Sequence, residues 1–349
     1  MSIYAGLDLH SNNVVIGLMG SEGQRIQQRR LPNRLANILD SLKPYKERIV
    51  KVGVEATYNW YWLVDGLQQD GYPVVLANPA GMKPYTGLKH SDDESDAFFV
   101  AELLRLNILP TGHIYEAKQR PFRDLLRRRQ SLVHQRTSLL LSLKSLCART
   151  NGQSLTQGEV KALSEANIPQ VLRHPADQLI ATEQVGLKAH LDKSIHRVEQ
   201  AVEAVADKLP CYRQLQTLPG VGRILALTIS METGPISRFA EAGNYASYCR
   251  CVQAERESNG KRKGENNAKC GNKYLAWAYV EAAHFARRSD PGCRRFYERK
   301  QAQTNTMVAT KALACKLAKA GWHVMKEDRP YDPRRVFPGL RKPVAPPTR

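Results

Sequence analysis

The stretch IYAGLDLHSNNVVIGLMG, residues 3–20, decides the fold of the N-terminal part of the chain. Two β-rich runs, 3–10 and 14–20, flank the turn residues SNN and therefore predict a β-hairpin. The more polar run QRIQQRRL, residues 24–31, is predicted to add a third strand. Of the 349 residues 42% are hydrophobic, which is enough to build one large domain or two.

Helix and strand patterns alternate after this hairpin, as their apolar spacing and bounding turn residues indicate. Three strands followed by alternating helices and strands predict an α/β domain with antiparallel strands first, over residues 1–112. The further predicted elements are a helix at 33–45, a strand at 48–57, a helix at 60–71 and a strand at 73–79.

Positive charge is concentrated after this domain. The formal net charge is +19, yet residues 1–112 carry 11 Lys and Arg against 12 Asp and Glu. The excess from residue 113 onward favours a polyanionic partner, most often nucleic acid; a basic surface that only aids solubility is the alternative. No apolar run approaches the roughly 18 residues of a transmembrane helix, which argues against a membrane protein. The scattered cysteines fit a reduced cytoplasmic setting, and Cys249, Cys251 and Cys270 lack a complete zinc ligand set.

Long helices are predicted for residues 113–209. In 122–150, leucines recur every seven residues and arginines dominate the other faces. A second apolar run, from Leu187 to Leu209, keeps the spacing of a packed helical seam. We expect these helices to form an antiparallel hairpin or a dimerising coiled coil. Basic residues of the first helix are candidates for nucleic-acid contacts, with a solvated helix face as the alternative: Arg123, Arg127, Arg128 and Arg129.

Residues 210–335 are predicted to form a mainly helical domain, followed by a basic, proline-rich tail over 336–349. Helices are expected at 274–288 and 303–326. The stretch 255–273 is rich in glycine, lysine and asparagine and is expected to be a loop.

The motif LPGVG, residues 218–222, indicates a tight turn within this helical region, as in a helix-hairpin-helix motif. The backbone N–H groups of such a turn can face a phosphate at the start of the next helix, which makes Gly220 and Gly222 candidates for nucleic-acid binding. An ordinary turn between two helices is the alternative.

Acidic residues stand at positions where propensity disfavours them. Asp8 interrupts an apolar strand, and Glu55 lies at the end of another. Asp93 and Asp96 are three residues apart at the start of an apolar helical run, so they share one helix face. Four carboxylates so placed suit one or two hard cations, as phosphoryl transfer requires. The alternatives are a helix cap at Asp92 or Asp93 and a solvated strand end at Glu55.

This order of acids, on the first strand, the fourth strand and a later helix, resembles the ribonuclease-H-like, RuvC-type nuclease fold. Over residues 3–335 the chain also resembles the DEDD-type insertion-sequence transposases of the IS110 family, in which a RuvC-like N-terminal domain precedes a C-terminal transposase domain. Seven motifs carry the resemblance, in the family's order: GLDLH (6–10), GVEAT (53–57), DESDA (93–97), LPGVG (218–222), SNGK (258–261), GNKYL (271–275) and RPYDP (329–333).

The resemblance implies roles for individual residues. The four acids match the family's metal-binding acids, which implies Mg²⁺ or Mn²⁺ as the cofactor. Ser258 matches the serine that attacks a DNA phosphate and forms a covalent phosphoserine link. The preceding segment YCRCVQAERES departs from the family's glycine- and proline-containing pattern, and a different alignment of the loop would move the match to Ser247. Cations near the serine are candidates for assisting the attack and for binding nucleic acid: Lys261, Arg262 and Lys263.

The resemblance also implies partners. Elements of this family encode a structured bridge RNA that pairs with donor and target DNA, so RNA pairing would select the sequence while the protein holds the backbone. It implies a homo-oligomer, dimer or tetramer, in which the RuvC-like domain of one protomer completes a site with the serine of another. We therefore expect an RNA-guided DNA recombinase that acts in the bacterial cytoplasm, at the nucleoid.

Two other functions fit parts of the pattern. A metal-dependent hydrolytic DNA nuclease of the junction-resolving kind would use water and the four acids, and would not need Ser258. A non-catalytic nucleic-acid-binding protein with a decayed ribonuclease-H-like domain is the third hypothesis, and the presence of all four acids argues against it. The serine separates the first two hypotheses, because strand joining through a covalent link requires a nucleophile on the protein.

Overall fold

The computed structural model describes residues 1–88, 93–152, 154–252, 255–259, 261–265 and 270–337. The chain forms two compact units, residues 1–118 and 119–349. No helix among the described residues is both long and apolar enough to cross a membrane.

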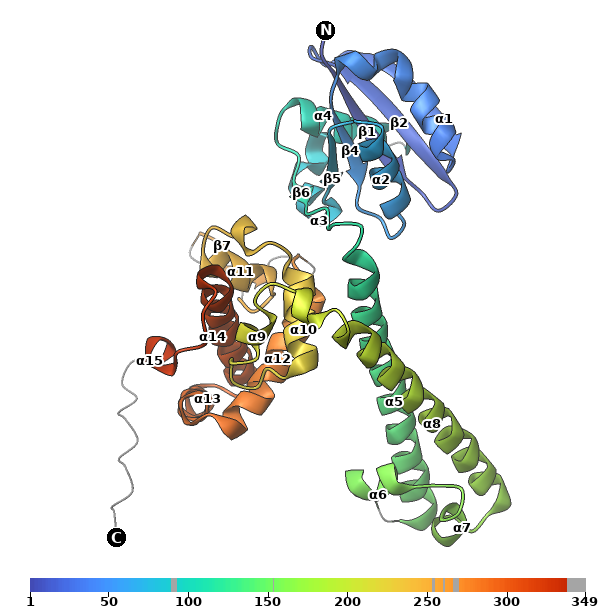
Figure 1. Cartoon of the computed structure of the whole chain (residues 1–349), viewed down its shortest axis with the longest axis vertical. Coiled ribbons are helices and arrows are strands. Elements are labelled where there is room, and N and C mark those ends of the chain that lie inside the picture. The colour runs from blue at the N-terminus through green and yellow to red at the C-terminus, as the bar shows by residue number, and fades with distance from the viewer. Residues whose placement is uncertain (89–92, 153, 253–254, 260, 266–269, 338–349) are drawn as a thin grey trace. The chain divides into compact units, whose positions relative to one another are not determined.

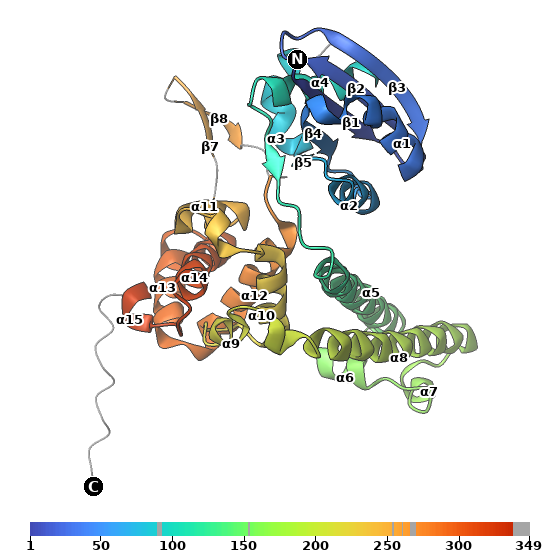
Figure 2. The same cartoon turned by 45° about the horizontal axis from the view of Figure 1, so that its top comes forward.

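The N-terminal unit is built on a mixed β-sheet (Figures 1 and 2). Its strands are β1 (Ile3–Leu9), β2 (Asn13–Gly20), β3 (Arg25–Pro32), β4 (Ile49–Glu55), β5 (Val74–Ala77) and β6 (Thr111–Gly112). In the described residues these six strands lie in the order β3-β2-β1-β4-β5-β6. The pairs β1–β2, β2–β3 and β5–β6 are antiparallel, whereas β1–β4 and β4–β5 are parallel. The predicted hairpin, the third strand and the α/β class are confirmed.

Helices cover both faces of this sheet. Ile3, Ala5 and Leu7 point to one face, where they join the apolar side chains of α1 (Leu35–Leu42) and α2 (Tyr61–Gln69) in one core. The alternate residues of β1 face α4 (Asp93–Arg105), which packs on the other side of the sheet. Short helical segments complete the unit: η1 (Lys43–Arg48), α3 (Pro79–Met82) and η2 (Lys83–Leu88).

Glycines let α4 lie unusually close to the sheet. A Cβ atom on Gly6 would overlap the carbonyl oxygen of Ala97 and lie 2.7 Å from the amide nitrogen of Ala101. A Cβ atom on Gly53 of the neighbouring strand would lie 2.7 Å from Cγ1 of Val100. Both distances are shorter than real Cβ contacts, so these two glycines fix how deeply the helix seats on β1 and β4.

Gly6→Ala is therefore expected to destabilise β1 and α4 by about 1–3 kcal/mol, because the added methyl group must displace helix backbone rather than a flexible side chain. Amide hydrogen exchange in β1 of the full chain measures this loss locally. Gly112→Ala is the control, since its Cβ would make an ordinary contact, 3.5 Å from Leu76. Equal protection of the β1 amides from exchange in both variants would contradict the close packing of α4 on Gly6.

The C-terminal unit begins with a long helical hairpin, α5 (Arg120–Asn151) and α8 (Pro175–Glu203). Arg129 pairs with Glu199 at 2.7 Å, and Arg136 pairs with Asp192 at 2.8 Å. Because positions rise along α5 as they fall along α8, the two helices are antiparallel, as Figure 1 shows. Of the two predicted arrangements, the antiparallel hairpin therefore forms within one chain. Two short helices pack near its tip, α6 (Gln157–Ala162) and α7 (Ile168–Val171).

The rest of this unit is mainly helical, as predicted. Its core includes two fully buried tyrosines: the hydroxyl of Tyr245 lies 2.8 Å from the hydroxyl of Thr233 and 3.0 Å from that of Tyr279. The helical elements are η3 (Ala206–Lys208), α9 (Tyr212–Leu215), α10 (Arg223–Thr233), η4 (Ile236–Arg238), α11 (Ala242–Tyr248), α12 (Lys273–Ser289), α13 (Pro291–Gln303), α14 (Thr306–Glu327) and α15 (Pro333–Val336).

Two regions differ from the sequence expectations. The stretch predicted to be a loop contains an antiparallel pair of strands, β7 (Glu255–Ser258) and β8 (Lys261–Glu265). Helix α13 was not predicted, because its polar sequence shows little apolar period. Its start does carry a local signal: Asp290 caps the helix by accepting a hydrogen bond from the backbone N–H of Cys293 at 2.7 Å.

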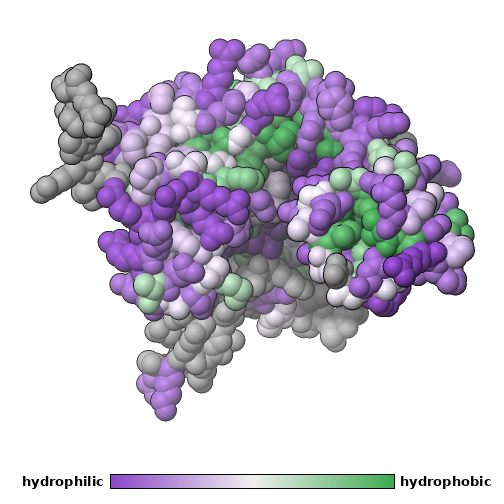
Figure 3. All heavy atoms as spheres, turned by 90° about the horizontal axis from the view of Figure 1, so that it is seen from below, coloured by the Kyte–Doolittle hydropathy of each residue, from purple (hydrophilic) through white to green (hydrophobic). Residues whose placement is uncertain are grey.

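The helical hairpin exposes several apolar side chains. Leu141 on α5 is 62% exposed, and Leu187 on α8 is 55% exposed. In the space-filling view of Figure 3, hydrophobic residues gather in patches within a mainly hydrophilic surface. Exposed leucines at helical positions are suitable for contacts with another chain.

Candidate active site

Two of the candidate acids lie side by side on the sheet. Asp8 follows Gly6 by two residues on β1, and Glu55 follows Gly53 by two residues at the end of β4. Since side chains two residues apart share a face, both carboxylates lie on the face that α4 covers. Leu7 is in register with Val54 of the parallel strand, so the next residues, Asp8 and Glu55, are neighbours at the carboxyl ends of the two strands.

Helix α4 runs antiparallel to β1. Its last residue, Arg105, donates a hydrogen bond to the carbonyl oxygen of Ser21 at 3.3 Å, and the N–H of Ser21 binds the carbonyl of Ser2, just before β1. Ala97, in the first half of the helix, lies over Gly6. The N-terminal turn of α4 therefore lies toward the end of β1 that carries Asp8.

The acids of α4 thus lie at the same end of the sheet as those of the strands. Asp96 immediately precedes Ala97 and is partly buried. Asp93 is the first residue of the helix, and its side chain lies outside the described part of the structure. Among the side chains that are described, no group of three or more His, Cys, Asp or Glu is arranged to hold a metal ion.

Polar side chains hold the loop that follows Asp8. The Oδ2 atom of Asp8 lies 3.2 Å from Nε2 of His10. The carbonyl oxygen of His10 accepts hydrogen bonds from the side-chain amides of Asn33 and Asn59, both at 3.0 Å. Thr57 in turn donates to the side-chain oxygen of Asn59 at 2.9 Å. Sequence reasoning missed both asparagines, because each binds a backbone group that is distant along the chain.

Ser258 ends strand β7, in register with Lys261 of β8, so it stands beside the tip of a β-hairpin. The side chains of Ser258, Arg262 and Lys263 lie outside the described part of the structure. Lys261 is exposed, as is Ser247, the alternative serine, which lies on α11.

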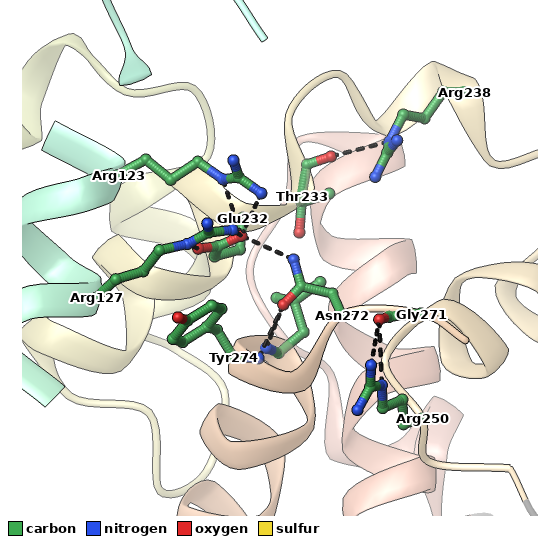
Figure 4. Close-up of polar contacts among 10 residues, drawn as sticks. Arg123, Arg127, Glu232, Thr233, Arg238, Arg250, Gly271, Asn272 and Tyr274 are labelled. Carbon is green, nitrogen blue, oxygen red and sulfur yellow. Dashed lines mark hydrogen bonds and ion pairs between the residues drawn. The ribbon is translucent and has the colours of Figure 1, made fainter. Parts of the chain in front are cut away.

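The β7–β8 hairpin lies in the segment 251–270, and contacts between the residues on either side hold the two ends of this segment close together. Arg250 donates hydrogen bonds from Nε and Nη2 to the carbonyl oxygen of Gly271, at 3.1 and 2.9 Å (Figure 4). The N–H of Asn272 donates to the carbonyl oxygen of Tyr248 at 2.6 Å. Gly271 has a φ of +87°, which favours glycine. A Cβ at this position would lie 2.5 Å from the Tyr248 carbonyl oxygen, so a larger residue does not fit where the two ends of the segment meet.

Glu232, on α10, is a buried carboxylate that links Asn272, at one end of this segment, to helix α5 (Figure 4). It is 1% exposed and accepts hydrogen bonds from Arg123 at 2.9 Å, from Arg127 at 2.6 Å and from the side-chain amide of Asn272 at 2.7 Å. Burial acts to raise the pKa of Glu232, but its bond to Arg127 and the charges of both arginines outweigh burial and lower the pKa. The side-chain oxygen of Asn272 accepts from the N–H of Tyr274 and so caps α12.

The predicted phosphate-binding arginines therefore occupy different environments. Arg123 and Arg127 bind Glu232, and Arg129 binds Glu199 on α8. Arg128 is exposed to solvent. Nucleic-acid binding stays a prediction for all four, and a phosphate would compete with a protein carboxylate at three of them.

The two glycines of the LPGVG motif also lie in different surroundings. A Cβ on Gly220 would overlap the carbonyl oxygen of Ala282, so the turn packs directly on α12. Gly222 stands at the N-cap of α10 with open space around its Cα. Close packing against α12 accounts for Gly220, and a phosphate contact at either glycine stays a prediction.

Two protein-family models match the chain. A DEDD-type IS110 model, described as a transposase, matches residues 5–151, and the model described as the transposase IS116/IS110/IS902 family matches residues 212–298. The chain belongs to the IS110 family of transposases. The first match includes the acids of the sheet and of α4, and the second includes Glu232 and Ser258, so both parts of the candidate site fall within IS110-family sequence.

Two curated relatives agree with this assignment. The chain is 24% identical over 239 residues to the transposase for insertion sequence element IS1111A of Coxiella burnetii, a match that covers 64% of this chain and 62% of the relative. It is 28% identical over 117 residues to the insertion element IS110 uncharacterized 43.6 kDa protein of Streptomyces coelicolor, covering 32% of this chain and 29% of that protein. The chain thus spans less than two thirds of the length of either relative.

Proposed function

We propose that this chain is a transposase that cuts and rejoins DNA by metal-assisted phosphoryl transfer. The observation that carries the proposal is the meeting of Asp8 and Glu55 at the ends of neighbouring parallel strands, on the face covered by α4. The first turn of α4 supplies Asp93 and Asp96 at the same end of the sheet. Membership of the IS110 family supports the same reading.

The N-terminal unit is proposed to be ribonuclease-H-like, or RuvC-like. Support comes from the strand order, with three antiparallel strands leading into two parallel crossovers, and from the positions of the acids on the first strand, the fourth strand and the helix that covers them. The domain boundaries proposed from the sequence, after residues 112, 209 and 335, are retained.

The donor set suits a hard divalent cation, Mg²⁺ or Mn²⁺, because all four side chains offer carboxylate oxygens. Asp8, Glu55, Asp93 and Asp96 would hold the ion. Such a cation would neutralise charge on the phosphate and polarise its P–O bonds. His10, 3.2 Å from Asp8, would keep that carboxylate oriented, and the asparagines that bind the His10 carbonyl would keep the loop in place.

Ser258 is proposed as the nucleophile. Its Oγ would attack the DNA phosphorus, the bond to the leaving strand would break, and that strand would depart with a free hydroxyl group after taking up a proton. A hydroxyl of the receiving strand would then attack the phosphoserine and release the serine. Each step exchanges one phosphoester bond for another, so strand joining would need no external energy source. Lys261, Arg262 and Lys263 would stabilise the negative charge on the phosphate during both steps.

The expected partners are donor DNA, target DNA and a structured bridge RNA, held by an oligomer. The excess of basic residues after position 112 supports nucleic-acid binding. The exposed leucines of α5 and α8 support contacts between protomers. A serine from one protomer would then complete the acidic site of another.

Asp8→Asn is expected to lower the rate of DNA strand cleavage by at least about 100-fold, because it removes a charged ligand at the centre of the acidic site. The assay uses purified protein, end-labelled DNA, the element's RNA and either Mg²⁺ or Mn²⁺. Asp40→Asn is the matched control: it removes one exposed acid from α1, on the opposite face of the sheet, and should leave the rate unchanged.

Binding of Mn²⁺, measured by calorimetry, provides a readout that does not depend on cleavage. Wild type and Asp40→Asn should bind the ion equally, and Asp8→Asn should bind it at least about 10-fold more weakly. Equal ion affinity and equal cleavage in all three proteins would show that the acids at this end of the sheet are not the metal site.

A further inference from the structure

A pocket in the C-terminal unit has no role in the chemistry proposed above. Its volume is about 290 Å³, and it lies between α14 and the segment from Arg329 to Val336. Residues 329–332 of the RPYDP motif line one wall, and Ala320 and Val324 of α14 contribute apolar surface. The motif is thus part of a pocket wall, although the proposed function assigns it no task.

Basic side chains line two sides of this pocket. Lys316 and Lys319 lie one turn apart on α14, and Arg329 and Arg335 come from the opposite wall. Neither lysine forms an ion pair within the part of the chain that the structure describes. The pKa of Lys316 is lowered, first by burial and then by the charges of Arg299 and Lys319, which means that its ammonium group is held among like charges.

Nearby acids do not balance this charge. The carboxylate of Glu327 is shared between two arginines, since it pairs with Arg329 and, at 2.9 Å, with Arg335. Its other oxygen lies 2.9 Å from Nδ1 of His323. Asp332 lines the pocket, and one of its oxygens accepts a hydrogen bond from a backbone N–H at the start of α15. Two arginines and two lysines therefore face two carboxylates, which leaves the pocket positive.

We propose that this pocket binds a phosphodiester group of a nucleic-acid backbone, with Lys316 and Lys319 on one side of the phosphate and Arg329 and Arg335 on the other. Lysine and arginine on opposite walls can contact several oxygens of one phosphate. The apolar surface of Ala320 and Val324 suits the sugar next to it. The choice of nucleic acid as the source of the phosphate rests on the proposed function.

The size of the pocket agrees with this ligand. A volume of about 290 Å³ equals that of roughly ten liquid water molecules, which accommodates a phosphate together with part of a sugar. Four cationic side chains and two carboxylates leave an excess of two positive charges, so a backbone phosphate with its single negative charge is attracted and only partly neutralises the pocket.

The test compares two double variants of the full-length protein that remove equal charge from the same helix. Lys316→Gln/Lys319→Gln changes the pocket, and Lys311→Gln/Lys326→Gln changes two exposed lysines of α14 that do not line it. Fluorescence anisotropy measures the affinity for labelled DNA and RNA oligonucleotides over a range of salt concentrations. Thermal unfolding of each protein is followed in parallel, and Lys319→Gln alone replaces the pocket variant if the double variant unfolds.

The pocket variant is expected to bind about 10-fold more weakly, and the slope of log Kd against log salt should fall by about one for each phosphate that the variant no longer binds. The control variant should change much less. A weakening confined to DNA or to RNA supports the pocket and identifies the strand that occupies it. Equal affinities for the two double variants would overturn the proposal.

Formation of the covalent protein–DNA adduct is scored in the same preparations, which separates this proposal from the proposed function. If the wild-type protein forms the adduct and the pocket variant binds DNA and RNA normally, only the proposed role of the pocket is refuted. A wild-type protein that forms no adduct, with binding weakened selectively in the pocket variant, would refute the serine chemistry and leave the pocket in place.

Discussion

Ser258→Ala is expected to abolish the covalent attachment of DNA to the protein and to slow strand joining by more than about 1000-fold, because no other group in the proposed mechanism forms the phosphoserine. The measurement is a denaturing gel of end-labelled DNA after reaction with the protein, its RNA and Mg²⁺. Binding of DNA should persist, since alanine removes one hydroxyl group and no charge.

Ser247→Ala is the matched control for this experiment. Ser247 is an exposed residue of α11, and its substitution should leave the adduct intact. Loss of the adduct in Ser247→Ala, with retention in Ser258→Ala, would move the nucleophile to α11. DNA that is cut by both variants and by wild type without any adduct would favour a hydrolytic nuclease that uses water and the four acids.

Glu232→Ala is expected to destabilise the C-terminal unit by about 3–5 kcal/mol, because it leaves the partly buried guanidinium groups of Arg123 and Arg127 without their shared carboxylate. It also removes the acceptor for Asn272, whose own oxygen caps α12. Urea unfolding measures the total loss of unfolding free energy. Hydrogen exchange at the amides of α12 measures the loss of local stability in that helix.

Asp207→Ala serves as the comparison, since its ion pair with Arg213 is largely exposed and should contribute less than about 1 kcal/mol. If Glu232→Ala were no more destabilising than Asp207→Ala, the buried network would have no structural role. Loss of the adduct in Glu232→Gln, with a folded protein and normal DNA binding, would show that the network also positions the serine hairpin.

The contribution of Glu232 should depend on pH in a defined direction. Its pKa in the folded chain is below the ordinary value of 4.5, so the stabilisation is fully present above about pH 4.5 and is lost as the pH falls through the lowered pKa. The stability difference between wild type and Glu232→Gln should therefore be constant near neutral pH and shrink below pH 4.5. A difference that grows on acidification would contradict the lowered pKa.

Much of the N-terminal unit could be predicted from the sequence because its signals are local. The alternating apolar runs on either side of SNN define the β1–β2 hairpin, and the apolar helix after Asp96 defines α4. The close approach of α4 to Gly6 and Gly53 could not be predicted, since it depends on which strands become neighbours. That approach is what places the acids of α4 at the same end of the sheet as Asp8 and Glu55.

The C-terminal unit was less predictable, because its polar contacts join residues far apart in sequence. Glu232 looks like an ordinary helix residue in the sequence, whereas its partners come from positions 123, 127 and 272. Glu232 directly follows the apolar run ILALTISM, and this was the signal available in the sequence. An acidic side chain in such an apolar helix requires a partner for its charge. The arginine-rich face of α5 suggested phosphate contacts, and the structure shows that carboxylates bind part of that face.

We propose that a serine of the β7–β8 hairpin becomes covalently linked to DNA in a reaction that depends on the acids of the sheet. The most direct test is mass spectrometry of the protein after reaction with DNA, nuclease treatment and trypsin digestion. Trypsin releases Ser258 in the peptide 257–261 and Ser247 in the peptide 239–250. A nucleotide attached to peptide 257–261 in wild type, and absent from Asp8→Asn, is the predicted result. Cleaved DNA without a nucleotide on either peptide would contradict the proposed phosphoserine mechanism.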